Sequence, residues 1–550
     1  MAWYLQLEGD TYEEANNSFS WNEVPDDYNI AVDCLRKHDD PKSRIALYQG
    51  YTGGQRETYT FHEIDVLSNQ LANSLEALEV ERGDRVAIID SQRYTTLVSH
   101  LACWKLGAIS VPLSPLFGNQ SLEYRLTHSS AKIVVADAGA REKLATVRSS
   151  CPGLQDVAWI GAESTGDDYS FEELISGSSR RFDPVNTDVD TPAIILYTSG
   201  STGTPKGTVH SHGVWLGHCP AFSMYFERDV FNSIYWTPAD WAWVGALGSL
   251  IFPAWHYGQP VVGYFGGKFD AKTAFKVLSE YDVTDAFIPP TAVRMLMSAE
   301  LSPEDHDLDI ETIVSGSEPL TPEIIQWVDR TLQNVVINEG YGQTEASVLA
   351  TNCHDWFELR PGSMGKPVVG FDIEIIDPET GDVLPRGEIG EVAVRRTAPV
   401  GLFKEYWNDP EQTAATRVGN WHSTGDLAKR DESGYLWFKG RSDDLIITSG
   451  YRVAPNEVEG VLLEHPAIDE IGVVGVPDET RGQVIKAVVK TTTSAGQSDS
   501  LREELRDLVR DELAEYAYPR IVEFVPELSR TETGKLDRDA LREERSSANG

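Results

Sequence analysis

Residues 197–207, Tyr-Thr-Ser-Gly-Ser-Thr-Gly-Thr-Pro-Lys-Gly, carry side chains that suit phosphate chemistry. The run before them at 193–196, Ala-Ile-Ile-Leu, has the length and aliphatic character of a buried strand. The glycines that follow let the backbone approach a ligand closely. The hydroxyl groups and the cation are those of Thr198, Ser199, Ser201, Thr202, Thr204 and Lys206. A strand that leads into backbone amides, hydroxyls and one lysine predicts a polyphosphate-binding loop.

Two other interpretations fit this segment less well. Pro205 stands where a Walker A loop requires its second glycine, so a loop of another kind is expected. A flexible surface linker has similar small residues, but linkers rarely follow a buried strand or end in Pro-Lys-Gly.

A second strand-like segment, residues 335–345, ends in side chains that suit nucleotide binding. Tyr341 can stack on a purine, Thr344 can bind a phosphate, and Glu345 can hold Mg²⁺. The same residues also fit an ordinary turn after a strand, so this segment alone leaves both interpretations open. Asp426 can accept both hydroxyl protons of a ribose, or it can cap a turn.

The histidines and tryptophans of residues 210–258 are less specific. His210 and His212 are close enough to share a metal, but no third ligand is evident nearby, which favours packing or hydrogen bonding. Tryptophans at 236, 241, 243 and 255 lie beside glycines at 245, 248 and 258. They suit the wall of an apolar acyl pocket and an ordinary core equally well, and both interpretations stay open.

Apolar and amphipathic segments alternate from residue 85 onwards, which predicts a layered α/β domain. The expected strands are 85–90, 108–111 and 132–136, and the expected helices are 95–106 and 122–126. Period-two alternation at 372–376 and 391–394 predicts antiparallel strands of a separate β-rich subdomain. Beyond residue 453, the pattern predicts a compact α+β unit with helices at 456–463 and 501–513 and strands at 471–476, 484–489 and 521–525. The second of these helices is expected to bury Leu501, Leu505, Leu508 and Leu513 on one face.

The composition excludes several classes of protein. The 550-residue chain is 41% hydrophobic and has 14 tryptophans, as expected for a folded protein of several domains. It has neither an apolar stretch of membrane-spanning length nor a signal-like N-terminus, which predicts a cytoplasmic protein. The 5 cysteines show neither metal-ligand spacing nor the density of a disulfide framework.

The formal net charge of −39 disfavours nucleic-acid binding. It comes from 86 acidic and 47 basic residues and is spread along the chain. An acidic surface repels anionic substrates, so a site for them must supply its own positive potential. High salt reduces the repulsion, because the screening length falls to about 3 Å at 1 M. A halophilic cytoplasm is therefore favoured over an ordinary acidic mesophilic protein.

Together, the motifs resemble those of the adenylate-forming superfamily, which includes acyl-CoA synthetases, aryl-CoA ligases, luciferases and the adenylation domains of peptide synthetases. The loop at 197–207, Tyr-Gly-Gln-Thr-Glu at 341–345 and the hinge sequence at 434–453 match closely, and the resemblance covers essentially the whole chain. Residues 317–320 resemble an adenine-contacting Gly-Glu-Pro-Leu element, with Ser317 in place of the glycine. The sequence in and around these motifs most resembles that of the medium-chain acyl-CoA synthetases.

The resemblance implies an α/β fold in two parts. A large N-terminal AMP-binding domain of layered α/β subdomains plus a β-rich subdomain is expected at 1–441. A hinge at 442–443, which includes Asp443, is expected to join it to a small, mobile α+β C-terminal domain at 444–550. The implied small molecules are ATP, Mg²⁺, CoA and a carboxylate.

The resemblance also implies roles for individual residues. Catalytic roles are expected for Lys206, Thr344, Glu345 and Lys535, with Glu345 as the metal ligand. Nucleotide contacts are expected from Thr198, Ser199, Gly200, Ser201, Thr202, Gly203, Thr204, Lys206, Ser317, Glu318, Pro319, Glu339, Gly340, Tyr341, Gly342, Gln343, Thr344, Asp426, Arg441, Arg452 and Lys535. The CoA channel is expected at Gly450 and Tyr451, and the acyl pocket at Trp241, Trp243, Gly245 and Gly342.

Gly342 carries the most specific expectation about the substrate. The acetate-specific branch of the superfamily has a tryptophan at this position, so a glycine implies space for a longer or cyclic chain. The alternative is that Gly342 serves a backbone turn with φ > 0.

The predicted function is AMP-forming activation of a short- to medium-chain or aromatic carboxylate, followed by transfer to CoA. Because the chain ends soon after the lysine loop, free CoA is expected as the acceptor. Another adenylate-forming ligase, such as an amino-acid-activating or luciferase-like enzyme, is the first alternative. A catalytically silent nucleotide-binding relative is the second, and the intact Lys206, Glu345 and Lys535 argue against it. Monomer and homo-oligomer both stay open.

Overall fold

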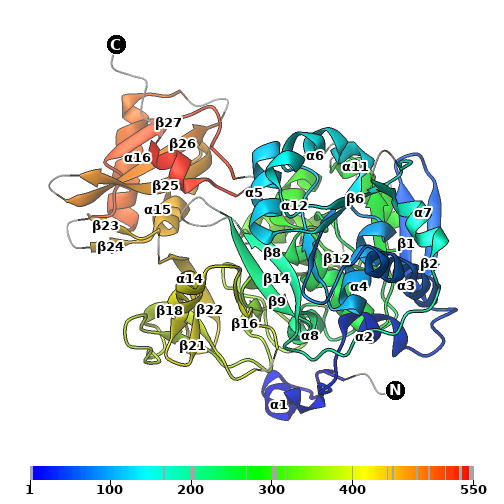
Figure 1. The fold of residues 1–550 in the computed structure, drawn as a ribbon. Coiled ribbons are helices and arrows are strands. Elements are labelled where there is room, and N and C mark those ends of the chain that lie inside the picture. The colour runs from blue at the N-terminus through cyan, green and yellow to red at the C-terminus, as the bar shows by residue number, and fades with distance from the viewer. Residues whose placement is uncertain are drawn as a thin grey trace.

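The structure is a computed structural model, and it describes fourteen segments of the chain. These are residues 4–164, 168–198, 205–267, 269–299, 306–318, 320–332, 334–398, 400–442, 444–448, 451–478, 481–492, 496–514, 516–531 and 535–543. The chain forms two large sheets with their helices, a β-rich unit and a smaller C-terminal unit (Figure 1), and the two large sheets take their strands from interleaved parts of the chain. This arrangement confirms the predicted α/β fold class.

The sheet that carries the candidate phosphate loop has the strand order β19-β9-β8-β4-β3-β5-β6-β7 among the described residues. Its strands are β3 (Arg85–Ile89), β4 (Ile109–Pro112), β5 (Ile133–Asp137), β6 (Asp156–Ile160), β7 (Tyr169–Ser170), β8 (Pro192–Thr198), β9 (Lys206–Ser211) and β19 (Glu405–Tyr406). The strands from β8 to β7 are parallel, whereas β9 and β19 are antiparallel to their neighbours. The helical segments are α4 (Tyr94–Leu106), α5 (Asn119–Ser129), η2 (Ala138–Ala140), α6 (Arg141–Val147), η3 (Arg148–Ser150) and α7 (Phe171–Gly177). The predicted alternation of strands and helices over 85–136 is confirmed.

The second sheet has the order β16-β15-β14-β13-β12-β10-β11-β1-β2 in the described part of the chain. Its strands are β1 (Ile45–Tyr51), β2 (Arg56–Thr60), β10 (Tyr235–Trp236), β11 (Val261–Phe265), β12 (Asp285–Phe287), β13 (Thr312–Gly316), β14 (Val336–Gln343), β15 (Ser347–Thr351) and β16 (Lys366–Pro367). The helical segments of this part are α1 (Tyr12–Ser18), η1 (Trp21–Glu23), α2 (Ile30–Arg36), α3 (Phe61–Ala77), α8 (Val214–Tyr225), α9 (Val244–Ala246), the π-helical turn η4 (Leu247–Ile251), α10 (Phe252–His256), α11 (Ala271–Glu280), α12 (Pro290–Met297) and α13 (Pro322–Thr331). β14 is parallel to β13 and antiparallel to β15.

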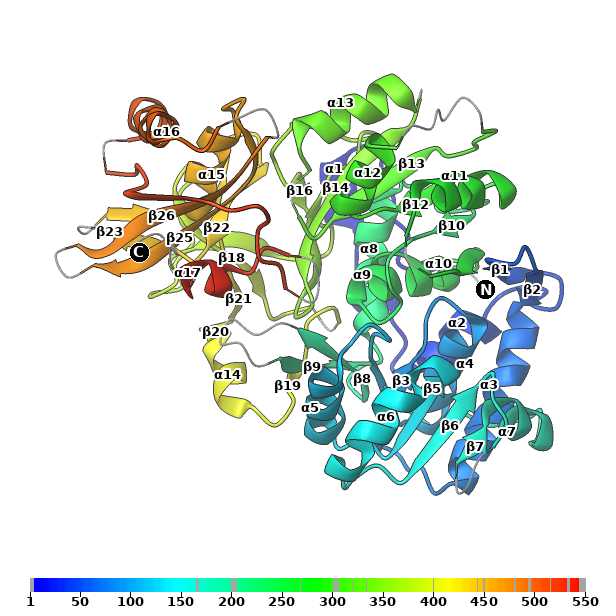
Figure 2. The ribbon, with the colours of Figure 1, turned by 90° about the horizontal axis from the view of Figure 1, so that it is seen from above.

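An aromatic core joins the two sheets. α8 and α10 lie between them (Figure 2). Phe252 of α10 packs against Trp104 of α4 and Trp215 of α8, with ring centroids 4.8 and 5.3 Å apart. All three side chains are at most 2% exposed. Burying aromatic surface on both sides fixes the sheets relative to each other, and with them the segments that follow β8 and β14.

The β-rich unit is antiparallel throughout its described strands. They are β17 (Ile373–Ile376), β18 (Ile389–Arg395), β20 (Arg417–Val418), β21 (Trp421–Arg430) and β22 (Leu436–Arg441), with α14 (Pro410–Ala415) before β20. Ile373 pairs with Val394, which confirms the antiparallel pair predicted from the period-two alternation.

The C-terminal unit has a sheet of its own. The elements are β23 (Ile446–Thr448), β24 (Tyr451–Val453), α15 (Pro455–Leu463), β25 (Ile468–Asp478), β26 (Gly482–Thr491), α16 (Asp499–Glu512), β27 (Ile521–Phe524) and α17 (Arg538–Glu543). α16 buries Leu501, Leu505 and Val509, whereas Leu513 lies past the helix end and is 36% exposed. The expected place of Leu513 on the buried face is therefore wrong, because Val509 continues the face one turn after Leu505. The exact domain boundaries stay a prediction.

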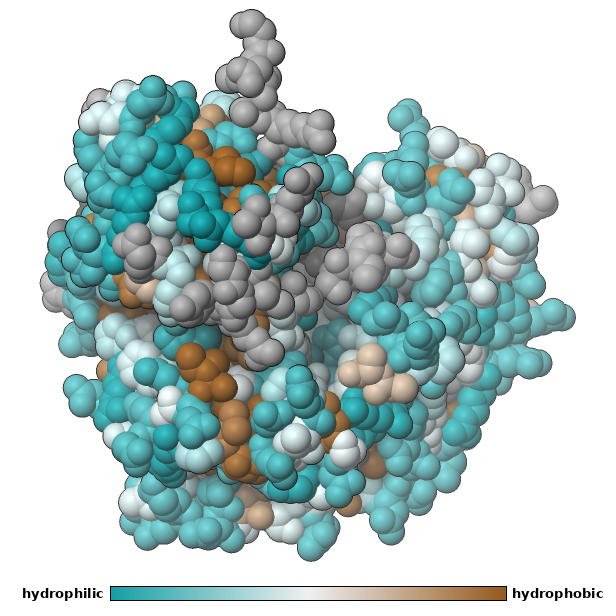
Figure 3. Space-filling model, turned by 90° about the vertical axis from the view of Figure 1, so that its left-hand side faces the viewer, coloured by the Kyte–Doolittle hydropathy of each residue, from teal (hydrophilic) through white to brown (hydrophobic). Residues whose placement is uncertain are grey.

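The surface is polar. The face shown in Figure 3 is mostly hydrophilic, with apolar residues in small separated groups. Among the described residues, no helix combines the length and the apolar character that a bilayer span needs. The 5 cysteines are free and buried.

Candidate active site

The candidate phosphate loop connects two neighbouring antiparallel strands. Thr198 ends β8 and pairs with Lys206, the first residue of β9. Ser199, Gly200, Ser201, Thr202, Gly203 and Thr204 lie outside the described residues. The element that follows these residues is therefore the antiparallel strand β9, whereas a Walker A loop leads into a helix.

Lys206 is held beside this loop by residues from a distant part of the chain. Its Nζ donates a hydrogen bond to Gln412 Oε1 at 3.1 Å and lies 5.1 Å from the ring centroid of Tyr406. A cavity of about 100 Å³ opens here, and its lining includes Tyr124, His128 and Lys206. The cation required for a phosphate site is thus ordered at the start of β9.

β14 runs further than expected and presents Tyr341 to the β-rich unit. The polar turn expected at the end of segment 335–345 begins only after Gln343, because residues 341–343 continue the strand and pair with β15. Tyr341 Oη donates to Asp426 Oδ2 at 2.7 Å, and Arg441 Nη1 donates to Asp426 Oδ1 at 3.2 Å. Burial, with the Asp426 carboxylate beside it, raises the pKa of the Tyr341 phenol. Three of the predicted nucleotide ligands therefore meet at one point.

Gln343 and Glu345 extend this cluster in two directions. Gln343 Nε2 donates to the backbone oxygen of Thr424 at 3.0 Å, two residues before Asp426. Glu345 Oε1 accepts a hydrogen bond from Tyr406 Oη at 2.8 Å. Thr344 lies between them in the turn after β14. The segment 341–345 therefore bridges the Asp426 cluster and the Lys206 cluster.

The expected adenine element has one unusual backbone position. Ser317 follows β13 with φ +76°, a conformation that glycine adopts most easily, which explains why a glycine is usual there. Glu318 is ion-paired with Arg294 at 2.6 Å, and Pro319 lies outside the described residues. Glu339 of β14 accepts a hydrogen bond from Leu320 N at 3.3 Å, and burial raises the pKa of its carboxyl to about 8.

The expected acyl-pocket residues divide into two groups. Trp241 is 0% exposed, whereas Trp243 and Gly245 are half-buried. The Trp243 ring packs edge-on against Phe117, with centroids 5.8 Å apart. A Cβ on Gly245 would lie 3.3 Å from the Phe287 ring. Trp243 and Gly245 therefore lie next to aromatic rings at partly exposed positions, whereas Trp241 lies in the core.

Gly342 has a different reason to be glycine. A Cβ built there would lie 2.1 Å from the backbone oxygen of Ser347 and 2.7 Å from Val348 Cα. Its φ is not among the positive values, so the alternative of a left-handed turn is wrong. The close approach of β14 and β15 excludes a side chain, and the geometry gives no support to a wall position for the acyl chain.

The predicted residues of the small domain are placed only in part. Asp443 and Gly450 lie outside the described residues, and Tyr451 and Arg452 form β24. Lys535 is exposed, and its backbone oxygen accepts a hydrogen bond from Thr531 N at 2.8 Å. No contact between Lys535 and the clusters on β9 and β14 occurs among the described residues.

An ion-pair network anchors the helix that follows Lys535. Arg538 Nη1 lies 2.6 Å from Glu459 Oε1, and Arg538 Nε lies 3.4 Å from Asp444 Oδ2. Arg542 Nη2 lies 3.0 Å from Asp444 Oδ1. The segment after Lys535 is therefore tied both to α15 and to the residue directly after the expected hinge.

The paired histidines have packing roles. His212 Nδ1 accepts a hydrogen bond from Ile30 N at 3.2 Å. Burial lowers the pKa of His210 to about 4 and that of His212 to about 3, so both rings are neutral at pH 7. The described residues contain no group of three or more His, Cys, Asp or Glu side chains that could hold a metal.

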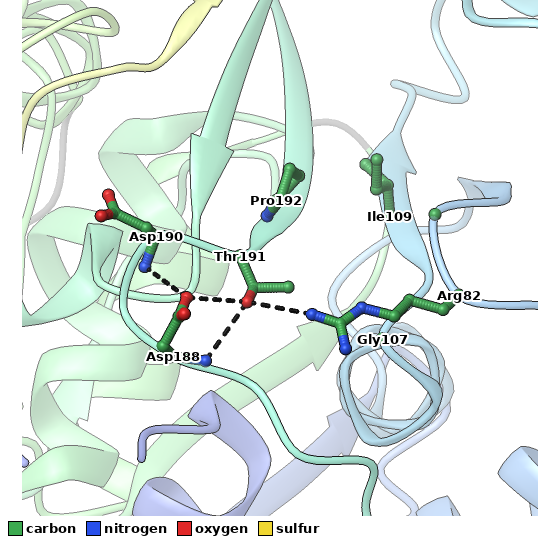
Figure 4. A pocket seen from close by; sticks show the side chains of 8 residues that line it. Arg82, Gly107, Ile109, Asp188, Asp190, Thr191 and Pro192 are labelled. Carbon is green, nitrogen blue, oxygen red and sulfur yellow. Dashed lines mark hydrogen bonds between the residues drawn. The ribbon is translucent and has the colours of Figure 1, made fainter. Parts of the chain in front are cut away.

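A surface cavity of about 300 Å³ lies away from this site (Figure 4). Arg82 Nη2 donates to Thr191 Oγ1 at 3.3 Å, and Thr191 Oγ1 donates to Asp188 Oδ1 at 2.8 Å. This cluster precedes β8, whereas the phosphate loop follows it, so about 20 Å of strand separates them. The cavity is thus distinct from the nucleotide cluster.

The sequence reasoning missed Tyr406, Gln412 and Arg294. Tyr406 is 61 residues from Glu345, and Gln412 is 206 residues from Lys206, so local spacing carries no signal of either contact. The polar and aromatic segment 405–409, Glu-Tyr-Trp-Asn-Asp, is a local sequence feature that could have drawn attention to Tyr406.

Comparison with known proteins assigns the family. The model of the AMP-binding enzyme family matches residues 36–407, and the model of the AMP-binding enzyme C-terminal domain matches residues 457–535. The chain belongs to the AMP-binding enzyme family. This AMP-binding enzyme is 36% identical to acyl-coenzyme A synthetase ACSM4, mitochondrial, of Rattus norvegicus over 95% of this chain and 91% of the relative. It is also 36% identical to acetyl-coenzyme A synthetase of Bacillus subtilis over 98% and 96% of the two chains.

The AMP-binding enzyme also resembles solved structures of MatB from Rhodopseudomonas palustris. The ATP-bound MatB structure is 29% identical, with a TM-score of 0.82 over 94% of this chain and 98% of that chain. The apo MatB structure, with the same identity and coverage, has a TM-score of 0.73. The arrangement of the AMP-binding enzyme is therefore more similar to the ATP-bound form.

Proposed function

We propose that the protein is an AMP-forming acyl-CoA synthetase for a short- to medium-chain or aromatic carboxylate. A carboxylate is a poor acylating agent because oxide is a poor leaving group. In the proposed reaction, a carboxylate oxygen attacks the α-phosphorus of ATP, and the bond to pyrophosphate breaks. The thiol of CoA then loses its proton and attacks the acyl carbon, and AMP leaves. Orienting two anions and stabilising the developing charge supply most of the acceleration in such a step.

The side chains divide this work. Asp426 and Arg441 would hold the ribose, Tyr341 the adenine, and Lys206 with the loop hydroxyls the phosphates. Because Tyr341 and Arg441 already orient the Asp426 carboxylate, little ordering is left to be done when the nucleotide binds. Ser317, Glu318, Pro319, Glu339, Gly340 and Gln343 would complete the purine side, and Arg452 would lie near the phosphate.

The donor chemistry around Glu345 fits Mg²⁺. This ion is usually bound through one or two carboxylates plus substrate phosphates and water. Glu345 is half-buried, and its Oε2 has no hydrogen-bond partner among the described residues. Mg²⁺ would neutralise phosphate charge there, and Thr344 would hold the α-phosphate beside it.

The small domain would act by changing position. We infer that Lys535 bridges the carboxylate and the α-phosphate during adenylation. Rotation about Asp443 would then withdraw Lys535 and open the path for CoA past Gly450 and Tyr451. The higher TM-score to ATP-bound MatB supports assigning the present arrangement to a nucleotide-binding state.

The observation that carries this proposal is the position of residues 341–345. This short segment contacts Asp426 on one side and, through Tyr406, Lys206 on the other, which supports assigning the ribose, phosphate and metal contacts to residues at one strand end. Two relatives named as CoA synthetases align over more than nine tenths of both chains and favour CoA as the acceptor over the alternatives of an amino-acid-activating or a luciferase-like enzyme.

The test is a carboxylate panel with ATP, Mg²⁺ and CoA. Because the relatives' names specify different acyl groups, the panel runs from acetate through hexanoate and decanoate to benzoate. We expect the highest kcat/KM for an acid longer than acetate, since each methylene in an apolar pocket contributes about 1–3 kcal/mol. A preference for acetate would contradict the chain-length part of the proposal.

The acidic charge supports a second proposal, that the protein works in a high-salt cytoplasm. The net charge of −39 should destabilise the compact state by self-repulsion, and salt should relieve this. From about 0.1 to 3 M KCl the screening length falls from about 10 Å to below 3 Å, so the urea midpoint should rise. Sucrose, which does not screen charge, is the control. A midpoint that is flat or falls with KCl would remove the halophilic interpretation.

A further inference from the structure

Tyr406 lies between the two charged groups that the reaction needs, although no sequence motif assigned it. Its Oη donates to Glu345 Oε1 at 2.8 Å, and its ring lies 5.1 Å from Lys206 Nζ. A phenol hydrogen bond to a carboxylate is charge-assisted and therefore stronger than a neutral one. An ammonium group above a tyrosine ring is attracted by the negative face of the ring. One side chain thus contacts the proposed metal ligand through its hydroxyl and the proposed phosphate ligand through its ring.

The backbone around Tyr406 fixes the position of its ring. β19 adds to the sheet beside β9, with Tyr406 opposite Thr208. Phe403 N donates to the backbone oxygen of Glu345 at 2.8 Å, and Trp407 N donates to that of Gly207 at 2.7 Å. Backbone hydrogen bonds therefore tie residues 403–407 to Gly207, the residue after Lys206, and to Glu345 itself. With a Tyr406 side chain that is 7% exposed, the phenol has little freedom to move.

We propose that Tyr406 is a positioning residue for both charges. It leaves Oε2 of Glu345 available to Mg²⁺ and, with Gln412, holds Lys206 in place at the start of β9. The proposal deepens the acyl-CoA synthetase assignment and rests on it. Loss of a partner that orients a metal ligand typically reduces metal affinity or activity 10–100-fold.

A purely structural role for Tyr406, in packing β19 against β9, predicts something different. Tyr406→Phe keeps the ring, its packing and its contact with Lys206, and removes the hydrogen bond to Glu345. Tyr406→Leu removes the ring contact as well. Tyr59→Phe is the matched control, because the Tyr59 hydroxyl also donates to a carboxylate, Glu57 Oε2 at 2.7 Å, on the edge strand β2 of the second sheet.

The test measures metal binding directly. Mn²⁺ binding to each full-length protein with a non-hydrolysable ATP analogue is followed by electron paramagnetic resonance. The affinity of the analogue without metal is measured separately by calorimetry. We expect Tyr406→Phe to weaken Mn²⁺ binding 10–100-fold and to leave metal-free analogue binding unchanged. Tyr406→Leu should weaken both, and Tyr59→Phe should weaken neither. In the adenylation assay, Tyr406→Phe should raise the Mg²⁺ concentration at half-maximal rate more than it lowers kcat.

Two outcomes separate this inference from the function on which it rests. Equal Mn²⁺ affinity in wild type and Tyr406→Phe would overturn the inference, whatever the activity or thermal midpoint of the variant. Weaker Mn²⁺ binding in Tyr406→Phe, together with a wild type that activates no carboxylate, would support the positioning role and overturn the synthetase assignment.

Discussion

Replacing Lys535 by alanine is expected to reduce the rate of acyl-adenylate formation about 10²–10³-fold, which is about 2.7–4 kcal/mol of transition-state stabilisation. The reason is that the proposed bridge between carboxylate and α-phosphate loses its one cation. Acyl transfer from supplied acyl-adenylate to CoA should keep nearly its full rate, because the proposed rotated state does not use this lysine. Both half-reactions are measured separately in rapid-quench experiments.

The exposed position of Lys535 allows its effect on catalysis to be separated from an effect on folding. Its side chain is exposed, whereas the network of Arg538 with Glu459 and Asp444 anchors the helix after it, so alanine should leave the fold unchanged. Lys490→Ala, at a lysine of β26 that pairs with Glu470, is the control for removing a charge from the same domain. Equal loss in both half-reactions of Lys535→Ala would reject the two-state scheme.

Substituting Gly342 is expected to damage the protein generally rather than to change its chain-length preference. A Cβ there meets the Ser347 oxygen at 2.1 Å, so even Gly342→Ala must push β14 and β15 apart. Overpacking of this kind typically costs about 1–3 kcal/mol. Gly342→Trp should lose ATP binding and activity on all carboxylates together, because Tyr341 and Asp426 are displaced along with the strand. Urea unfolding and nucleotide-binding titrations measure the two effects.

Gly340 offers a matched control two residues earlier on the same strand. A Cβ there lies 3.7 Å from Val348 Cγ1, an ordinary contact, so Gly340→Ala should leave the urea midpoint unchanged. If Gly342→Trp instead kept ATP affinity and shifted preference towards acetate, residue 342 would face the acyl chain after all. Trp243 and Gly245 are otherwise the positions where changes in chain-length preference are expected.

Much of the fold follows from local patterns in the sequence. β3, β4 and β5 are short aliphatic runs separated by helices, and strands of a parallel sheet buried on both faces have that continuous apolar character. The strands β17 and β18 follow from period-two alternation, because successive side chains of a strand point to opposite faces of its sheet. The buried face of α16 differs from the expected one in its second half, where Val509 is buried, Leu508 is half-buried and Leu513 is exposed.

The parts of the site that local patterns do not predict depend on long-range contacts. The polar residues near the end of segment 335–345 favour a turn, yet pairing with β15 keeps residues 341–343 in a strand. The strand β19 has two residues, and its place beside β9 depends on a chain segment about two hundred residues away. The sequence predicts roles for Lys206 and Glu345. The contacts of Tyr406 with both of them depend on the pairing of β19 with β9 and cannot be predicted from local sequence.

The most direct measurement of the central claim is the stoichiometry of one reaction. Purified protein is incubated with ATP, Mg²⁺, CoA and hexanoate, and the products are quantified by liquid chromatography and mass spectrometry. The account predicts hexanoyl-CoA, AMP and pyrophosphate in equal amounts, and hexanoyl-adenylate when CoA is omitted. ADP and phosphate as products, or no carboxylate-dependent consumption of ATP across the panel, would contradict it.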